Sequence, residues 1–145
     1  METLKINKLD PDAIIPTRAT NGSAGFDLYA LLNERIRIWP GQKIMFRTGI
    51  RMAIPKGYFG AIYAKSGLSV KHGIRPATCV SVIDDDYRQE VMVPLVNEGE
   101  RVFDTLPGDR IAQIVFQKYN VFEIEEADDW QEDTERTGGF GSTGR

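Results

Sequence analysis

The stretch that decides the fold spans residues 79–90 and has the sequence CVSVIDDDYRQE. Its β-branched run, Val80 to Ile83, predicts a buried strand that ends in three consecutive carboxylates. A strand holds its backbone stiffly, so an aspartate at its end can be aimed in a way that a loop aspartate cannot. Adjacent carboxylates repel one another, which favours compensation by solvent, a cation or a metal ion. On these residues alone, a solvated turn and an aimed carboxylate both remain open.

Length and composition indicate one compact domain. The chain has 145 residues, of which 41% are hydrophobic and 27% charged, as is ordinary for globular proteins. Its net charge of -3 does not indicate stable nucleic-acid binding. No apolar run approaches the length of a membrane span, and the N-terminus lacks a signal-peptide pattern. We therefore expect a cytoplasmic protein that does not contact membranes, with a nuclear or virus-infected-cell location as the alternative.

One cysteine and one histidine limit the chemistry of any site. Cys79 lies beside the apolar run and cannot form an internal disulfide, so we expect a buried, inert thiol. The single histidine, His72, argues against a His-based zinc site and a His-dependent triad. A metal ion here would be a hard, oxygen-liganded ion such as Mg2+.

The rest of the chain alternates short apolar runs with glycine and proline turns, which predicts an all-β sandwich or barrel. We expect one short helix within residues 65–73, a hairpin-type connection at 97–100, and an edge strand or bulge at Pro94. The predicted strands besides the organising one are residues 4–9, 24–30, 36–38, 44–48, 50–54, 58–64, 89–96 and 110–117.

The end of the chain departs from this pattern. Residues 123–135 carry many acids and no Lys or Arg, which indicates a tether. Residues 136–145, RTGGFGSTGR, cannot form a core. They are either a disordered end or an arm that orders on a ligand, with glycine amides and hydroxyls around phosphate oxygens and Phe140 on a flat ring. We expect a core over residues 1–122 and an acidic tether with a glycine-rich arm over 123–145.

Five blocks carry the chemistry of the chain, namely residues 24–30, 65–68, 82–88, 108–113 and 139–144. In this order and spacing they closely resemble the five blocks of the homotrimeric deoxyuridine triphosphate nucleotidohydrolases, the dUTPases. The sequences GDRIAQ at 108–113 and GFGSTG at 139–144 are highly specific when they occur in one short chain. The resemblance implies a jelly-roll-like β-sandwich with one short helix and a flexible C-terminal arm. It also implies a homotrimer with active sites at subunit interfaces.

The resemblance further implies a Mg2+-assisted hydrolysis of dUTP to dUMP and pyrophosphate, which limits uracil in DNA and supplies dUMP for dTMP synthesis. By this match Asp84 activates the water that attacks the α-phosphate, and Asp27 contacts the Mg2+ hydration shell through water. An ordinary aspartate is a weak base, with a pKa of about 3.9. Position and electrostatics must therefore supply most of the acceleration.

The same match assigns the substrate contacts. Tyr87 packs under the deoxyribose, Phe140 covers the uracil, and backbone groups of the third block pair with the base. The complete implied substrate-binding set is Lys65, Ser66, Gly67, Ser81, Val82, Ile83, Tyr87, Gln113, Arg136, Phe140, Gly141, Ser142 and Thr143. Outside this set, we expect Asp109 and Arg110 to stabilise the fold, and Asp85 and Asp86 to be solvated neighbours of Asp84.

Four departures from the family pattern bear on selectivity. Lys65 replaces the usual arginine and loses its forked geometry, and Ser81 and Gln89 each replace a glycine. The last block is one residue shorter, which affects the role of Arg136. These departures keep open a catalytically weakened relative that acts through a protein partner. A dCTP deaminase of similar fold is the other alternative, although that family lacks the GFGSTG tail.

Overall fold

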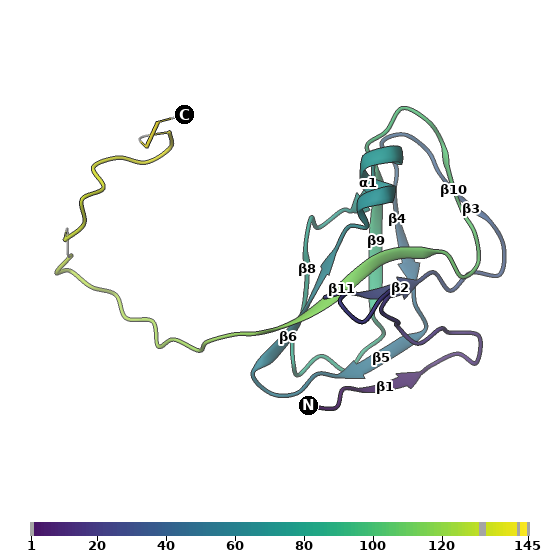
Figure 1. Cartoon of the computed structure of the whole chain (residues 1–145), viewed down its shortest axis with the longest axis horizontal. Coiled ribbons are helices and arrows are strands. Elements are labelled where there is room, and N and C mark those ends of the chain that lie inside the picture. The colour runs from purple at the N-terminus through teal and green to yellow at the C-terminus, as the bar shows by residue number, and fades with distance from the viewer. Residues whose placement is uncertain (1, 131–132, 142, 145) are drawn as a thin grey trace.

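The computed structural model describes residues 2–130, 133–141 and 143–144, and Figure 1 shows their arrangement. Within them lie eleven strands and one short helix, which confirms the predicted all-β class. The elements are β1 (Lys5–Lys8), β2 (Phe26–Tyr29), β3 (Ile36–Ile38), β4 (Lys43–Arg47), β5 (Ile50–Ala53), β6 (Tyr58–Tyr63), α1 (Ser66–His72), β7 (Ile74–Pro76), β8 (Ser81–Ile83), β9 (Met92–Asn97), β10 (Phe103–Thr105) and β11 (Arg110–Lys118).

The described strands form open antiparallel sheets that enclose one core, as expected for a jelly-roll-like fold. The two larger sheets have the strand orders β2-β11-β6-β8 and β4-β9-β7, and the pairs β1-β5 and β3-β10 complete the structure. Buried apolar side chains from both larger sheets fill this core, for example Ile114 of β11 and Phe46 of β4. Each such apolar side chain contributes about 1.5–3 kcal/mol when it leaves water.

The predicted helix is confirmed as α1, which begins directly after Lys65. It ends at Gly73, whose φ of 69° is left-handed and whose backbone N–H points to the carbonyl groups of Leu68 and Ser69. A side chain at Gly73 would also meet the backbone of Gly99, because a Cβ there would lie 2.5 Å from its nitrogen. Helix and sheet therefore join through a turn that only glycine fits.

The strand predicted to be buried is instead an edge strand. β8 pairs only with β6, and its central residue Val82 is 59% exposed. Val80 is exposed as well, just before β8. The prediction of a buried thiol was also wrong, because Cys79 is exposed in the preceding turn with a φ of 62°. A β-branched run predicts a strand. Whether that strand is central or at an edge, and whether its side chains are buried, depends on segments from elsewhere in the chain.

Pro94 lies in β9, a central strand, so the predicted edge or bulge was wrong. The Pro94 carbonyl accepts a hydrogen bond from the Ala77 N–H at 2.7 Å. In an antiparallel strand, the nitrogen and carbonyl of one residue face the same neighbour. The missing N–H of Pro94 therefore faces Ala77, directly after β7 ends at Pro76, so the bond that proline cannot make falls at the end of the ladder.

The connection at residues 97–100 is not a hairpin, because β10 pairs with β3 and not with β9. The buried side chain of Asn97 directs the chain into the other sheet. Its Nδ2 donates hydrogen bonds to the carbonyl groups of Ile38 and Arg101, both at 2.8 Å, and its Oδ1 accepts one from Gly99 N–H. A buried amide that satisfies three backbone groups outweighs the local turn signal.

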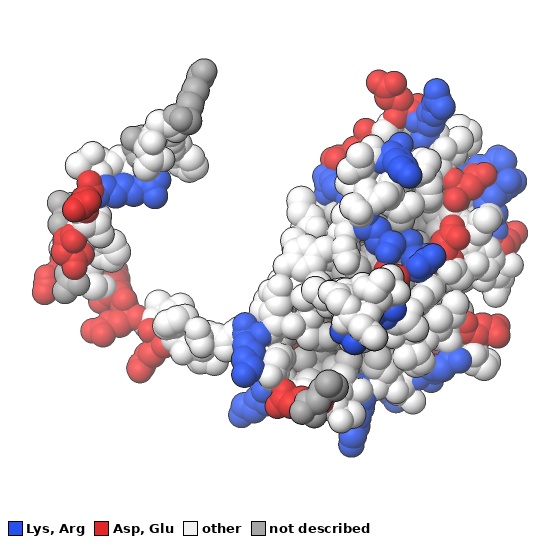
Figure 2. All heavy atoms as spheres, viewed as in Figure 1, with Lys and Arg blue, Asp and Glu red and all other residues white. Residues whose placement is uncertain are grey.

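After β11 the chain extends away from the sheets (Figure 1). Every described residue from 119 to 144 is exposed and lies outside helices and strands. Acidic side chains gather along this segment in Figure 2. The division into a core and an arm at residue 122 stays a prediction. No helix among the described residues is long and apolar enough to cross a membrane.

Candidate active site

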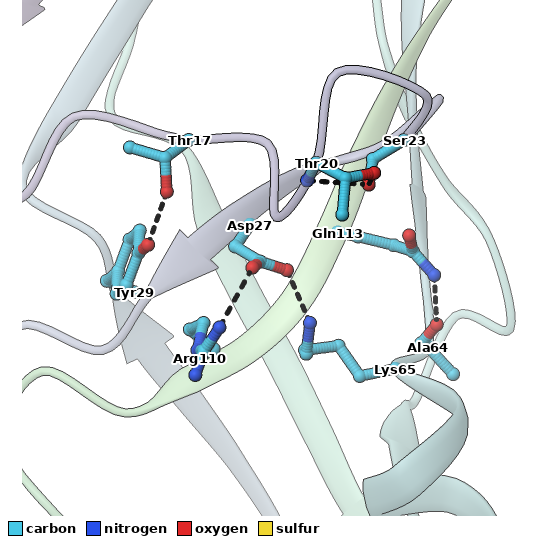
Figure 3. Close-up of polar contacts among 9 residues, drawn as sticks. All are labelled: Thr17, Thr20, Ser23, Asp27, Tyr29, Ala64, Lys65, Arg110 and Gln113. Carbon is cyan, nitrogen blue, oxygen red and sulfur yellow. Dashed lines mark hydrogen bonds and ion pairs between the residues drawn. The ribbon is translucent and has the colours of Figure 1, made fainter.

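A buried carboxylate on β2, that of Asp27, lies between two cations (Figure 3). Its side chain is 7% exposed, and Lys65 Nζ pairs with Oδ1. Arg110 places Nη1 3.6 Å from Oδ2. Both cations reach the surface, so one buried negative charge is balanced by two partly exposed positive charges. The partly exposed ammonium and guanidinium groups offer charged hydrogen-bond donors to an anion beside Asp27.

Gln113 ties the Asp27 region to the start of α1. In the sheet it lies between Asp27 on β2 and Tyr63 on β6. Its Nε2 donates a hydrogen bond to the carbonyl of Ala64 at 2.9 Å, which fixes the chain just before Lys65. A Cβ on Gly25 would lie 2.4 Å from the Gln113 amide oxygen, so a side chain there would displace the Gln113 amide. Gln113 is therefore locked in place by packing and by a hydrogen bond.

The fold thus brings Asp27, Lys65 and Gln113 together, with Ser66 and Gly67 next to Lys65 at the start of α1. These residues and Arg110 form the first group, the Asp27 group. A cavity of about 410 Å³ opens beside them, lined by Lys65, Leu68, Phe103, Asp109, Arg110 and Ile111. Asp109 closes its own turn, since Oδ2 accepts a hydrogen bond from Leu106 N–H at 2.8 Å. Arg110 instead faces Asp27. Sequence reasoning missed this neighbour because the two residues lie far apart in the chain.

The second group, the Asp84 group, consists of Asp84 and the turn around it. Asp84 follows β8 and is exposed. The turn is closed by a hydrogen bond from Tyr87 N–H to the Asp84 carbonyl at 3.2 Å. The Tyr87 hydroxyl donates to the Glu90 carbonyl at 2.8 Å, which holds the ring in one orientation. A cavity of about 510 Å³ adjoins this turn, lined by Phe59, Val82, Asp84, Asp85, Asp86 and Tyr119.

Asp85 is anchored, so the expectation that it is only a solvated neighbour of Asp84 was wrong. Its Oδ2 accepts hydrogen bonds from Gly57 N–H at 3.0 Å and from the Tyr119 hydroxyl at 2.8 Å. These two bonds, with Gly57 the larger cause, hold the pKa of Asp85 below its usual value. The same contact raises the pKa of the Tyr119 hydroxyl. Asp86 is exposed, as expected.

The third block occupies the outer strand of its sheet. Ser81, Val82 and Ile83 pair with β6 on one side, and no described strand pairs with them on the other. Ser81 has an ordinary strand conformation, and its Oγ lies 2.6 Å from Thr78 Oγ1. The loss of glycine at this position therefore strains nothing. Backbone donors and acceptors on the outer side are free to bind a ligand.

The two groups lie far apart within one chain. Asp27 pairs across to Gln113 and then Tyr63, whereas Ile83, just before Asp84, pairs with Gly60. Three strand spacings of about 4.8 Å and four residues of about 3.4 Å separate them, so the distance is roughly 20 Å. The two carboxylates of one chain are too distant to act on the same phosphate group.

The family model of the dUTPases matches residues 11–144 and so spans both groups. The chain belongs to the dUTPase family. The predicted family is thereby confirmed. A deoxyuridine 5'-triphosphate nucleotidohydrolase of Finegoldia magna is 42% identical over 90% of this chain and 91% of that protein. One from Acinetobacter baumannii is 40% identical over 98% of each chain.

Solved dUTPase structures share the fold. The Staphylococcus bacteriophage 80alpha dUTPase with dUPNHPP superposes with a TM-score of 0.89 at 23% identity and covers 100% of both chains. A variant of the phage phi11 dUTPase, described as coordinating a structural Mg(II) ion, has a TM-score of 0.80 at 21% identity. It covers 89% of this chain and 99% of that one.

The described arm residues of this dUTPase lie away from both groups. Phe140 is fully exposed, as are Arg136, Gly141 and Thr143. Arg136 Nε donates a hydrogen bond to the carbonyl of Gly138 at 3.1 Å, a contact within the arm itself. Ser142 lies outside the described residues. The fold of one chain therefore does not bring the last block to either carboxylate.

Proposed function

We propose that this dUTPase hydrolyses dUTP to dUMP and pyrophosphate at sites that neighbouring copies build together. Family membership confirms the predicted enzyme class, a dUTP diphosphatase. The observation that carries the proposal is the separation of Asp27 and Asp84 by roughly 20 Å along one sheet. An Asp84 group from one copy beside an Asp27 group from another completes a site. A homotrimer with three equal sites satisfies this requirement.

Asp84 serves as the base in this proposal. Its carboxylate is exposed and has no hydrogen-bond partner among the described residues, so an oxygen is available to accept a proton from water. The hydroxide that results attacks the α-phosphorus and displaces pyrophosphate. The Tyr87 ring, held by its hydroxyl on the Glu90 carbonyl, supports the deoxyribose and leaves no room for a 2′-hydroxyl.

The outer edge of β8 recognises uracil. Successive residues of an antiparallel strand direct their backbone N–H and carbonyl groups to opposite sides. Along Ser81, Val82 and Ile83, the groups that point away from β6 are used by no described strand. Uracil presents one ring N–H between two carbonyl oxygens, a pattern that a strand edge can match. Backbone groups held by the sheet make this pairing stiff, which supports discrimination against the amino group of cytosine.

The Asp27 group binds the phosphates. Lys65 and Arg110 supply charged donors, and Ser66, Gly67 and Gln113 supply uncharged donors. Lys65 must leave Asp27 to reach a phosphate. Its ammonium group is a point charge on a flexible stem, so it can change partners more easily than a forked guanidinium.

Asp27 suits Mg2+ only in an outer role. Among residues 2–130, 133–141 and 143–144, no group of three or more His, Cys, Asp or Glu side chains could hold a metal ion. Mg2+ commonly keeps several waters and takes phosphate oxygens, with one or two carboxylates nearby. Asp27 would then hold the ion through one of its waters. The ion, when bound, neutralises phosphate charge during the reaction.

The arm closes the site over the nucleotide. Fully extended, residues 122–140 span up to about 60 Å, ample to reach a neighbouring copy. Phe140 covers the base, while Arg136, Gly141, Ser142 and Thr143 contact the phosphates. Water exclusion strengthens the charge interactions at the phosphates. The product dUMP is available for dTMP synthesis, and removal of dUTP limits uracil in DNA.

Pyrophosphate release from dUTP with Mg2+ tests the proposal directly. The parental protein and Asp84→Asn are compared on dUTP, UTP, dTTP and dCTP, with and without a chelator. Release from dUTP by the parent alone supports the proposal. Ammonia release from dCTP identifies a deaminase instead, and an inactive parent supports a weakened relative that acts through a partner.

A further inference from the structure

Tyr119 is held in place by three contacts where the chain leaves β11 for the arm (Figure 1). Its backbone N–H donates a hydrogen bond to the Gly57 carbonyl at 3.1 Å. Its ring packs edge-to-face on Phe59, with centroids 6.4 Å apart. Its hydroxyl donates to Asp85 Oδ2 at 2.8 Å. Backbone and ring are thus fixed to the start of β6, so the hydroxyl occupies a fixed position.

Gly57 completes a closed network with Tyr119 and Asp85. Its N–H donates to the same Asp85 oxygen at 3.0 Å, while its carbonyl accepts from Tyr119. Gly57 has a φ of +87°, which glycine adopts without strain. Three segments distant in sequence are therefore joined: the turn before β6, the turn after β8 and the residue after β11.

This network controls the turn that carries Asp84. Exposure alternates along it, since Asp84 and Asp86 are exposed and Asp85 between them is half-buried. An anchored Asp85 side chain fixes the backbone of its neighbour. The direction in which the Asp84 carboxylate leaves the sheet then follows from the anchor. The lowered pKa of Asp85 is consistent with a carboxylate held by donors in its ionised form.

We propose that Tyr119 and Asp85 are positioning residues that aim the Asp84 carboxylate at the reacting phosphate. The inference rests on the proposed function, in which Asp84 is the base. Misplacement of a reacting group by about 1 Å can cost about 100-fold in rate, so a loosened turn should lower kcat. The Tyr87 ring is held separately, by its hydroxyl on the Glu90 carbonyl, and the base contacts lie on β8, so KM should change less than kcat.

Four variants separate positioning from stability. Tyr119→Phe removes the donor and Asp85→Ala removes the acceptor, whereas Asp85→Asn keeps an acceptor oxygen. Tyr63→Phe is the matched control, because among the described residues that hydroxyl takes part only in a long 3.4 Å contact with Gln117 Nε2. Steady-state hydrolysis, thermal unfolding and oligomer mass are measured for each variant.

We expect kcat to fall about 3- to 10-fold in Tyr119→Phe and about 10- to 100-fold in Asp85→Ala, with KM within about twofold. Asp85→Asn should recover most of the loss, and Tyr63→Phe should match the parent. The double variant Tyr119→Phe with Asp85→Ala should be no slower than Asp85→Ala alone. Parental kcat in Tyr119→Phe and Asp85→Ala, with or without a lower Tm, overturns the inference.

Amide hydrogen exchange provides a second readout that needs no activity. Faster exchange at the Gly57 and Tyr87 amides in Tyr119→Phe supports the anchor, because these amides report the network and the Asp84 turn. Unchanged exchange there overturns the inference. A parental protein that releases no pyrophosphate overturns the proposed function, and the exchange result then still decides whether Tyr119 anchors the turn that carries Asp84.

Discussion

Asp27 and Asp84 lie on one sheet of one chain, yet their surroundings are opposite. Asp27 is buried and paired with Lys65 and Arg110, whereas Asp84 is exposed at the end of an edge strand. A buried carboxylate that balances cations organises charge for a bound anion. An exposed carboxylate that pairs with no cation in the described part of the chain keeps its lone pairs for a proton. The same residue type therefore serves two purposes, which the fold assigns by depth and by neighbours.

Asp84→Asn is the strongest test of this contrast. The amide is nearly isosteric, so fold and binding of a non-hydrolysable dUTP analogue should be retained. It cannot accept the proton of water, so kcat should fall between about 100- and 10,000-fold. Pyrophosphate release and analogue titration measure the two effects. Near-parental turnover would rule out Asp84 as the base.

Deletion of residues 136–145 tests whether the two groups suffice without the arm. Because the described residues of the segment are exposed, its loss should leave Tm and oligomer mass unchanged. Hydrolysis should fall about 100-fold, since the phosphates then remain in water. Phe140→Ala should be milder, because the phosphate contacts stay. Full activity after the deletion would contradict closure by the arm.

Mixed oligomers test whether the two groups meet between copies. Asp84→Asn and Asp27→Asn are each expected to be nearly inactive alone. Refolded together at equal amounts, they should regain about a quarter of parental activity, because one site in four then combines two unchanged halves from different copies. Light scattering should show a trimer throughout. No recovery in a mixed trimer would place both halves in one chain.

Tyr87→Ala tests whether the Asp84 side also selects the sugar. Loss of the fixed ring opens the space of a 2′-hydroxyl, so preference for dUTP over UTP should weaken about tenfold. The ratio of the two kcat/KM values measures this change. Phe at the same position serves as the control, because it keeps the ring and should keep most of the preference.

The smallest expected effect concerns pH. The pKa of Asp85 is lower in the folded state, so its contribution to stability is present above its unfolded pKa of about 3.9 and is lost as pH falls through the folded pKa. Tyr119→Phe removes one of the two hydrogen bonds that cause the shift. NMR titration of the Asp85 carboxyl should show its pKa move toward the usual value. Tyr63→Phe should leave it unchanged.

Sequence alone was sufficient for the fold class, the helix after Lys65 and the family, because these depend on local patterns. Short β-branched runs with glycine turns specify strands whatever lies beside them. The blocks at residues 82–88 and 108–113 identify chemistry by residue type and order. The roles of Asp84 and of the other implied site residues stay predictions until they are measured.

Only the tertiary structure decided which strands pair with one another. β8 is an edge strand and β9 a central one, contrary to the prediction for both Val82 and Pro94, because a strand's neighbours come from distant parts of the chain. The pairing of Asp27 with Arg110 and of Asp85 with Tyr119 likewise joins residues far apart in sequence. No local sequence pattern predicts such contacts, because they depend on the register in which distant strands pair.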